Sequence, residues 1–285
     1  LNSFVFLNGQ FVPEEQAVVS VFDRGFLYGD GLFEALRVYG SQPFRWTRHL
    51  ERLQRGADFL KIRLPFTAAE LRNHAAELIR RNQMPECLLR LVLSRGVGPR
   101  GYSPRGADHP VLVMSLHPAP VVDPKNPPRW RLITSSCRLP AGEPLAQFKT
   151  CNKLRQVLAR AEADAANAQE ALLLNTDGKV AETSSGNLFW IDGNTVCTPP
   201  VASPVLPGVT RAVVMEICQS LGIPTRETAV PPQELLRAQA VFLSLTSMGI
   251  VEAVSLDGQL LNQSPLVAQI RAAYEKLTQT TLPEP

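Results

Sequence analysis

The spacing of apolar residues predicts strands and helices in the first part of the chain. Two apolar runs within residues 4–12 flank Asn8-Gly9, a dipeptide that favours a two-residue hairpin turn. Apolar side chains recur at helical spacing over residues 46–60, and Thr67 and Glu70 have the spacing of a capping box that opens a second helix. Further strands are expected at residues 88–93 and 111–116. Residues 1–117 are therefore expected to form an α+β layer.

The second half of the chain also mixes strands and helices. Asp-Gly pairs at 177–178, 192–193 and 257–258 stand between apolar runs and predict three hairpins. A helix is expected over residues 152–166, with Leu154, Val157, Leu158 and Ala161 on one face. The other expected elements are strands at 130–135 and 240–245 and helices at 210–221 and 265–277.

A proline-rich segment separates these two halves. Five of the 24 prolines fall between His117 and Pro128, a composition that favours a stiff, extended connection. We therefore expect an N-terminal domain at residues 1–117, a linker at 118–128 and a larger C-terminal domain at 129–285. The fold class is α+β, and a ligand is expected between the two domains, where binding sites are common.

Composition and charge exclude several classes of protein. The 285 residues are 45% hydrophobic and 19% charged, and no apolar run approaches the ~18 residues that a membrane-spanning helix needs. The net charge of +3 comes from scattered basic residues, which favours neither nucleic acid nor a lipid surface as a partner. Five cysteines without a C-x-x-C pair, and a start without a basic and apolar leader, lead us to expect a cytoplasmic protein with reduced thiols.

Familiar catalytic and nucleotide-binding motifs are missing from the sequence. It contains no G-x-x-x-x-G-K-[ST], H-E-x-x-H or G-x-S-x-G, and its four histidines are unclustered, so no metal site is expected. Residues 96–101 match G-x-G-x-x-G after a predicted strand. Loop-forming residues follow them where a dinucleotide site needs a helix N-terminus, so we do not expect a dinucleotide there.

Two segments offer hydroxyl and backbone N–H groups to a phosphate. Residues 206–211 open a predicted helix, where Gly208 permits close approach of the backbone and Thr210 supplies a hydroxyl. Residues 244–247, Ser-Leu-Thr-Ser, form a second hydroxyl cluster at the end of an apolar strand. Taken alone, the first segment also fits an ordinary helix N-cap and the second an ordinary turn.

Lysine is scarce, and one of the six lysines has an unusual setting. Lys149 follows the apolar segment 144–148 and precedes a predicted helix that contains Lys153. Imine formation needs an unprotonated amine, which apolar and cationic neighbours favour. Glu182 stands among small residues, where a carboxylate needs a cationic partner such as a protonated pyridine nitrogen. The alternatives are a surface lysine at a helix start and an exposed glutamate on a strand.

Five blocks of the sequence occur in the order found in a known enzyme family. They are residues 23–34, 49–53, 149–152, 182–189 and 206–211. Together they resemble the class IV aminotransferases, the fold type IV enzymes that use pyridoxal 5′-phosphate, and the resemblance spans residues 4–255. Branched-chain aminotransferases, D-amino-acid aminotransferases and 4-amino-4-deoxychorismate lyases belong to this family. The resemblance implies two mixed α/β domains with the cofactor between them, an amine or amino-acid substrate, and a homodimer.

The resemblance also implies a role for each matching residue. Lys149 would form the Schiff base with the cofactor and move the proton at the substrate α-carbon. Glu182 would pair with the pyridine nitrogen, and Leu206 would pack against the ring. The cofactor phosphate would be bound by Arg52, Gly208, Val209, Thr210 and Thr246. The substrate side of the site would include Tyr28, Phe33, Arg95, Arg100, Tyr102 and Ser247.

Three local patterns favour the lyase, which releases pyruvate and leaves 4-aminobenzoate. Arg95 and the following Gly-rich loop resemble a carboxylate-binding loop of lyase members. Asn152 stands three residues after Lys149, as in lyases and some D-amino-acid transaminases, whereas branched-chain enzymes usually have Asn-Tyr one place later. Residues 247–251, Ser-Met-Gly-Ile-Val, lack the Glu-Ile-x-Pro-Val that transaminases commonly show after this turn. Against the lyase, Ala35 occupies a place where several lyases carry threonine. The alternative is a transaminase of D- or branched-chain amino acids.

Overall fold

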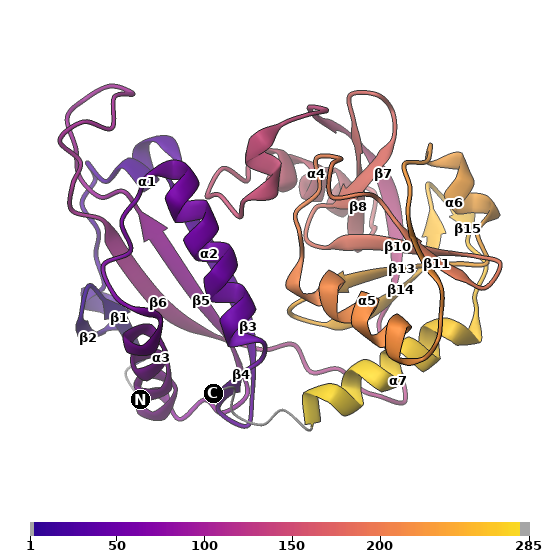
Figure 1. The fold of residues 1–285 in the computed structure, drawn as a ribbon, viewed down its shortest axis with the longest axis horizontal. Helices are drawn as coiled ribbons and strands as arrows, with labels where there is room; N and C mark the ends of the chain where they lie inside the picture. The colour runs from indigo at the N-terminus through magenta and orange to yellow at the C-terminus, as the bar shows by residue number, and fades with distance from the viewer. Residues whose placement is uncertain (1–2, 280–285) are drawn as a thin grey trace. The chain divides into compact units, whose positions relative to one another are not determined.

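The first half of the chain folds into an antiparallel sheet with two helices on one face. The computed structural model describes residues 3–279, and its first unit comprises residues 3–119 and 148–152 of these (Figure 1). Within the described residues the strand order is β2-β1-β6-β5-β3-β4. The strands are β1 (Phe4–Leu7), β2 (Gln10–Pro13), β3 (Gly31–Tyr39), β4 (Gln42–Pro43), β5 (Cys87–Ser94) and β6 (Val111–Pro118). The helices are α1 (Arg24–Tyr28), α2 (Trp46–Leu60), α3 (Ala68–Asn82) and the 3-10 turn η1 (Glu14–Gln16).

Local sequence signals account for most of these elements. Asn8 and Gly9 both have positive φ, as the tight β1–β2 hairpin requires. The capping box is confirmed, because the Thr67 hydroxyl accepts a hydrogen bond from the Glu70 backbone and the Glu70 carboxylate accepts one from the Thr67 backbone. The apolar stripes of α2 and α3 pack on the same core side of the sheet, against residues such as Leu36 and Leu91.

The glycine-rich segment after β5 forms a loop, as expected. Gly96 has a φ of +84°, and a Cβ at this position would lie 1.9 Å from the His109 carbonyl oxygen. The Arg24 guanidinium holds the loop by donating to the carbonyl oxygens of Gly101 and Tyr102, at 2.9 and 3.1 Å. The glycine therefore serves the backbone geometry of the loop.

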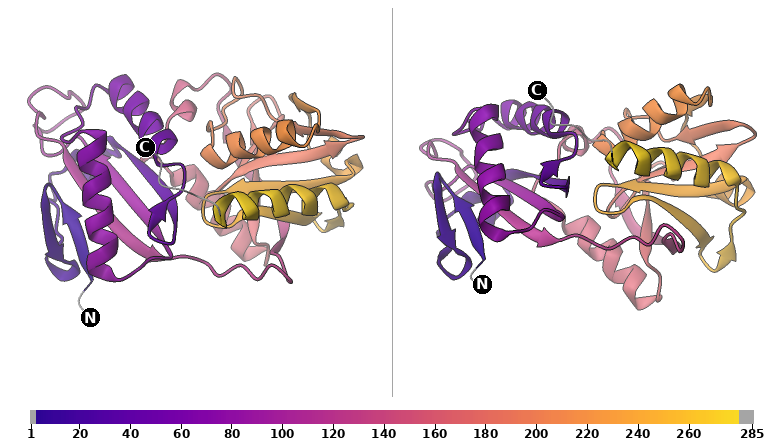
Figure 2. Two further views of the ribbon diagram at one scale, coloured as in Figure 1. Left: turned by 60° about the horizontal axis from the view of Figure 1, so that its bottom comes forward. Right: turned by 90° about the horizontal axis from the view of Figure 1, so that it is seen from below.

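The second unit is built on a mixed sheet and comprises residues 120–147 and 153–279 of the described chain. Within that part the strand order is β12-β11-β10-β13-β14-β7-β8-β9, and β15 pairs with β14. The strands are β7 (Arg129–Leu139), β8 (Glu170–Asn175), β9 (Val180–Thr183), β10 (Asn187–Asp192), β11 (Thr195–Thr198), β12 (Thr225–Glu227), β13 (Ala240–Leu245), β14 (Gly249–Leu256) and β15 (Gln259–Leu260). The helices are η2 (Pro144–Gln147), α4 (Leu154–Ala165), α5 (Val209–Ser220), α6 (Gln233–Arg237) and α7 (Pro265–Gln279). Helices α5 and α7 lie side by side (Figure 2).

The three hairpins predicted at Asp-Gly pairs are confirmed in this unit. They join β8 to β9, β10 to β11 and β14 to β15. Pro118, the first residue of the expected linker, ends β6, and residues 119–128 contain no regular helix or strand. None of the helices within residues 3–279 is long and apolar enough to cross a membrane.

Helix α4 is confirmed, but its larger apolar residues do not pack into the core. Leu154, Val157 and Leu158 are exposed, and the helix instead buries Ala159 and Ala163. Small residues let α4 approach β7 and β8 closely. Helical spacing shows that residues share a face, and it does not show which face the sheet covers.

The segment that carries Lys149 groups with the first unit, although in sequence it lies within residues 129–285. Leu32 and Thr150 form an isolated β-bridge. The Phe33 backbone N–H donates to the Lys149 carbonyl oxygen, and the Cys151 N–H donates to the Gly31 carbonyl oxygen, both at 2.9 Å. Residues 149–151 thus pair with the start of β3, a long-range contact that sequence order does not reveal.

Candidate active site

Lys149 lies beside β3 with its amino group over an aromatic ring. Its Nζ is 4.6 Å from the centroid of the Phe33 ring, and the Arg90 guanidinium carbon is 4.3 Å from the same centroid. The lysine is half-buried, and the β3 pairing fixes its backbone. The structure therefore brings together two residues expected in the site, Lys149 and Phe33.

Glu34, the next residue of β3, holds a buried cluster of charge. Its Oε1 accepts from Arg52 Nε, its Oε2 accepts from Arg52 Nη2, and Oε2 also lies next to His49 Nδ1, all at 2.7 Å. His49 and Arg52 are three residues apart on α2 and therefore share one helix face. Glu34 is 0% exposed and Arg52 is 4% exposed. Arg52, expected at the cofactor phosphate, is thus anchored to a carboxylate by a two-pronged ion pair.

The ionisation states in this cluster follow from burial and the neighbouring charges. Burial raises the pKa of Glu34, but the charge and hydrogen bonds of Arg52, with a hydrogen bond from His49, outweigh it and lower the pKa to about 2. Burial lowers the pKa of His49, the charges of Arg52 and Lys149 lower it further, and Glu34 opposes them. Glu34 is therefore ionised at neutral pH, and we assign a neutral His49 that donates its Nδ1–H to it.

Sequence reasoning did not single out Glu34 or His49 for a role in the site. The signal that could have found Glu34 is its place in β3, because the other side chains on its buried face are Leu32, Leu36 and Val38. A charged residue in such a row needs a buried partner. The partner is Arg52, and no pattern along the sequence links α2 to that position of β3.

In the second unit, Glu182 and the start of α5 lie close together. Glu182 is on β9, and its Oε2 accepts a hydrogen bond from the Leu206 backbone N–H at 2.9 Å. Helix α5 begins at Val209 after Gly208 and has no side-chain cap at its N-terminus. The first backbone N–H groups of a helix favour an anion. Leu206, expected at the cofactor, is thus bonded to Glu182, and the other expected residues of this segment, Gly208, Val209 and Thr210, follow it along the chain at the start of α5.

Asn187 connects this helix start to the sheet. Its Nδ2 donates to the Leu206 carbonyl oxygen at 2.9 Å, and a Cβ at Gly208 would lie 2.0 Å from its Oδ1. Asn187 pairs with Ser244 near the end of β13, and Thr246 follows in the turn before β14. The close approach requires glycine at position 208. Because β10 and β13 are paired, Thr246, another expected phosphate ligand, lies at the end of β13 that is next to Asn187.

The residues expected on the substrate side have different surroundings. Arg95 is buried, pairs with Asp30 at 2.8 Å and donates to the carbonyl oxygens of Leu60 and Lys61. Because the guanidinium is bonded to Asp30 and to two backbone carbonyl groups, it has a structural role in this unit, and the structure does not support the expected carboxylate-binding role. Ser247 lies in the β13–β14 turn of the second unit.

The loop after β5 carries two of the other expected substrate-side residues. Arg100 and Tyr102 are exposed on it. Tyr28, a third, supports the loop because its hydroxyl accepts from the Gly101 N–H at 3.2 Å and its ring packs edge-on against that of Tyr102. The structure thus places Tyr28 against Tyr102, with Arg100 on the same loop.

Asn152 has a structural role beside α1. Its Nδ2 donates to the Gly29 carbonyl oxygen at 3.1 Å. Gly29 has a φ of +67°, and a Cβ there would lie 2.4 Å from Asn152 Oδ1. The asparagine therefore packs against the turn that ends α1.

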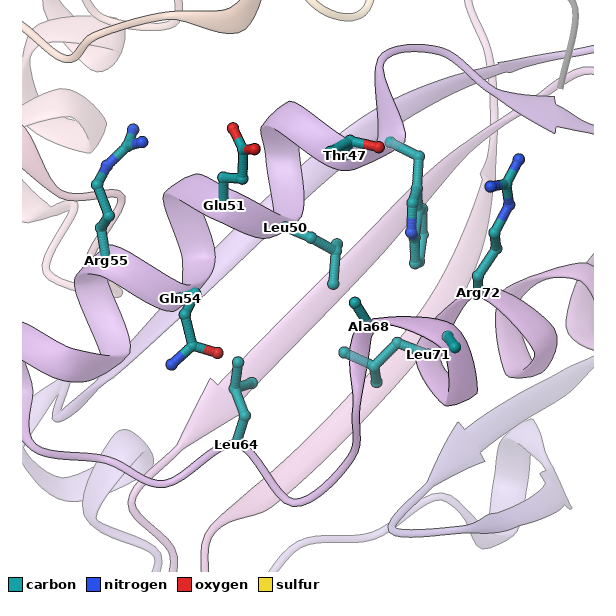
Figure 3. Close-up of a pocket in the computed structure, with 11 residues that line it drawn as sticks. Thr47, Leu50, Glu51, Gln54, Arg55, Leu64, Ala68, Leu71 and Arg72 are labelled. Carbon is teal, nitrogen blue, oxygen red and sulfur yellow. The ribbon is translucent and has the colours of Figure 1, made fainter. Parts of the chain in front are cut away.

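A cavity of about 730 Å³ lies between α2 and the start of α3 (Figure 3). It is bounded by α2 and the start of α3, with Trp46, Leu50, Leu64 and Leu71 among its apolar walls. None of the residues expected in the active site lines it. In the described part of the chain, no group of three or more His, Cys, Asp or Glu side chains could hold a metal ion.

Comparison with known proteins places these features in a family. Residues 31–256 match the family model described as amino-transferase class IV. A putative branched-chain-amino-acid aminotransferase of Methanocaldococcus jannaschii is 36% identical, covering 95% of this chain and 94% of that protein. D-alanine aminotransferase of Bacillus licheniformis is 30% identical, with 95% of each chain covered.

Solved structures agree with the sequence comparisons. The branched-chain aminotransferase of Thermoproteus uzoniensis, solved with norvaline, superposes with a TM-score of 0.91 at 29% identity, covering 97% of this chain and 95% of that one. A further branched-chain amino acid aminotransferase, solved with pyridoxamine 5′-phosphate, superposes with a TM-score of 0.92. A putative 4-amino-4-deoxychorismate lyase of Legionella pneumophila superposes with a TM-score of 0.86 at 30% identity, covering 92% and 96%. The α+β fold expected from the sequence is thereby confirmed.

The low pKa of Glu34 predicts that the protein loses stability in acid. Because the folded pKa of about 2 is below the ordinary value of 4.5, the contribution of Glu34 is present above pH 4.5 and is lost as the pH falls toward 2. Its size is on the order of 3 kcal/mol. Urea unfolding should be measured between about pH 6 and pH 3. The difference in unfolding free energy between the parent and Glu34→Gln should become smaller as the pH falls.

The matched control is Glu77→Gln. Glu77 also pairs with two arginines, Arg80 and Arg81, but on an exposed helix surface where ion pairs contribute little. Its substitution should leave the unfolding free energy nearly unchanged at either pH. Parallel pH curves for the parent and Glu34→Gln would contradict the assignment of an ionised Glu34.

Proposed function

Because the chain belongs to the class IV aminotransferases, we propose that it is an amino-acid aminotransferase that transfers the amino group of an amino acid to a 2-oxo acid. The enzymes of this family use pyridoxal 5′-phosphate, whose ring accepts the electrons released when the substrate α-carbon loses a proton. The observation that carries the proposal is the placement of Lys149. Its backbone is fixed to β3, and its amino group lies over Phe33 in the unit that also contains Arg52.

The residues of the chain fit the groups of this cofactor. Lys149 would bind the cofactor carbonyl carbon and then hold and move the proton at the substrate α-carbon. Glu182 would accept a hydrogen bond from the protonated pyridine nitrogen. Arg52, with Val209, Thr210 and Thr246, would bind the phosphate, for which a guanidinium charge and an uncapped helix N-terminus are suited. Gly208 fits this arrangement because only glycine fits against Asn187.

Two of the three patterns that favoured the lyase have structural explanations. Arg95 is occupied by Asp30 and two backbone carbonyl groups, and Asn152 packs against Gly29. The names of the relatives from Methanocaldococcus jannaschii and Bacillus licheniformis support an aminotransferase. The lyase remains the second candidate, because Arg100 and Tyr102 stay exposed on their loop and because of the likeness to the Legionella pneumophila protein.

An exposed apolar patch supports assembly into a homodimer. Within residues 18–27, Val18, Val21, Phe22 and Phe26 are each more than 60% exposed. The patch continues onto the neighbouring loop, because Val97 forms a β-bridge with Asp23 and exposed Tyr102 packs on Tyr28. A contiguous apolar surface of this kind is typical of a protein interface. We propose that a second copy of the chain covers it.

The reaction can be identified from the form in which the cofactor is left. The protein loaded with pyridoxal phosphate is mixed with single L- and D-amino acids without an acceptor. An aminotransferase should convert the cofactor to pyridoxamine phosphate, as read from its absorbance, with the matching 2-oxo acid formed in equal amount. Substitution Lys149→Ala should reduce turnover by about 10³-fold or more, because it removes the group that moves the proton.

The control variant for this test is Lys153→Ala, which removes a neighbouring lysine outside the proposed machinery and should retain turnover. Release of pyruvate from aminodeoxychorismate without an acceptor, and no conversion by any amino acid, would assign the lyase instead. Activity of Lys149→Ala close to that of the parent would refute the role of Lys149.

The dimer proposal predicts that one charge on the patch separates the subunits. Phe26→Glu should sediment as a monomer of 31.3 kDa, because burying an unpaired carboxylate at an interface is strongly unfavourable. The parent should sediment as a dimer at the same concentration. Leu260→Glu is the control, because Leu260 is exposed on β15 outside the patch. A monomeric parent, or a dimeric Phe26→Glu, would contradict the proposal.

A further inference from the structure

Glu34 is a buried carboxylate whose position the proposed chemistry does not by itself require. Its strand face is otherwise apolar, and its two oxygens are occupied by Arg52 Nε, Arg52 Nη2 and His49 Nδ1 at 2.7 Å. An anion beside Arg52 opposes the binding of a second anion there, because it cancels the positive charge of the guanidinium. A site selected only for attraction to phosphate would lack this carboxylate.

We propose that Glu34 and His49 are positioning residues that fix the orientation in which the Arg52 guanidinium meets the cofactor phosphate. The proposal rests on the proposed function, because it takes Arg52 as a phosphate ligand. A guanidinium is planar, and its five N–H donors are fixed relative to one another. Holding Nε and Nη2 on one carboxylate therefore sets the direction of every other donor.

His49 supplies the third fixed point of this arrangement. Its Nδ1–H donates to the same Glu34 Oε2 that accepts from Arg52 Nη2. Because His49 and Arg52 come from one face of α2, the carboxylate is held between two groups of one rigid helix. Burial and the positive charges of Arg52 and Lys149 lower the pKa of His49, so the ring holds the carboxylate without adding a charge beside Lys149.

One binding measurement distinguishes a role of Glu34 in orienting Arg52 from a role as an opposing charge, because the two roles change the affinity for phosphate in opposite directions. The full chain is freed of cofactor, and its dissociation constants for pyridoxamine 5′-phosphate and for pyridoxamine are measured. Neither probe has the carbonyl group that reacts with lysine, so the ratio of the two constants reports the phosphate site alone. If Glu34 positions Arg52, Glu34→Gln should raise the dissociation constant of pyridoxamine 5′-phosphate by about tenfold or more. The dissociation constant of pyridoxamine should stay within about twofold of that of the parent.

Other results would overturn the proposal. Tighter binding of the phosphorylated probe by Glu34→Gln would mean that the carboxylate acts only as an opposing charge. An equal rise in the dissociation constants of both probes would mean that Glu34 only supports the fold. Glu77→Gln, which loses an exposed pair with Arg80 and Arg81, should change neither constant. If the parent fails to bind the phosphorylated probe, the proposed function fails, and this result differs from all of those above.

Two further variants keep the test decisive. In an Arg52→Lys background, Glu34→Gln should have no additional effect on the ratio, because the effect of Glu34 passes through the arginine fork. If Glu34→Gln does not fold, His49→Gln tests the same proposal while keeping the Glu34–Arg52 pair. It should weaken the phosphorylated probe alone, by a smaller factor. If folded His49→Gln leaves the ratio of the two dissociation constants unchanged, His49 has no positioning role. If Glu34→Gln changes this ratio in the Arg52→Lys background as much as in the parent, Glu34 does not act through Arg52.

Discussion

The pairing of residues 149–151 with the start of β3 is the constraint on which the candidate active site depends. Two hydrogen bonds of 2.9 Å join this short segment to Gly31 and Phe33. They bring Lys149 to a strand whose neighbouring residue, Glu34, is bonded to Arg52 of α2. Without this pairing the lysine would belong to the second half of the chain, where sequence order places it. The proposed nucleophile and the proposed phosphate ligand are thus parts of one folded unit.

The buried charges beside this pairing form a balanced set. Glu34 and Arg52 cancel in charge, and a neutral His49 completes the hydrogen bonding of the carboxylate. Replacing a whole buried ion pair with well-packed apolar residues is often neutral or stabilising, so the retention of such a pair in a core calls for a second explanation. Control of the direction of Arg52 supplies one. In the second unit, Asn187 has a comparable effect, because it fixes the chain around Gly208 where α5 begins.

Features encoded by neighbouring residues could be predicted from the sequence, and features that depend on distant contacts could not. Asn8-Gly9 and the Thr67 capping box act over a few residues, and the structure contains both. The scarcity of lysine and the ordered family blocks identified Lys149 as a candidate. The unit to which Lys149 belongs depends on pairing across more than one hundred positions with β3. The exposed face of α4 likewise depends on which small residues meet the sheet.

The most direct test of this account is to find where pyridoxal phosphate attaches to the chain. The full-length protein is incubated with pyridoxal phosphate, reduced with borohydride and digested, and the modified peptide is identified by mass spectrometry. We predict one cofactor adduct, on Lys149, together with the loss of the yellow colour of the bound cofactor on reduction. An adduct on Lys153 instead, or a protein that takes up no pyridoxal phosphate, would contradict the assignment of Lys149 as the residue at the centre of the site.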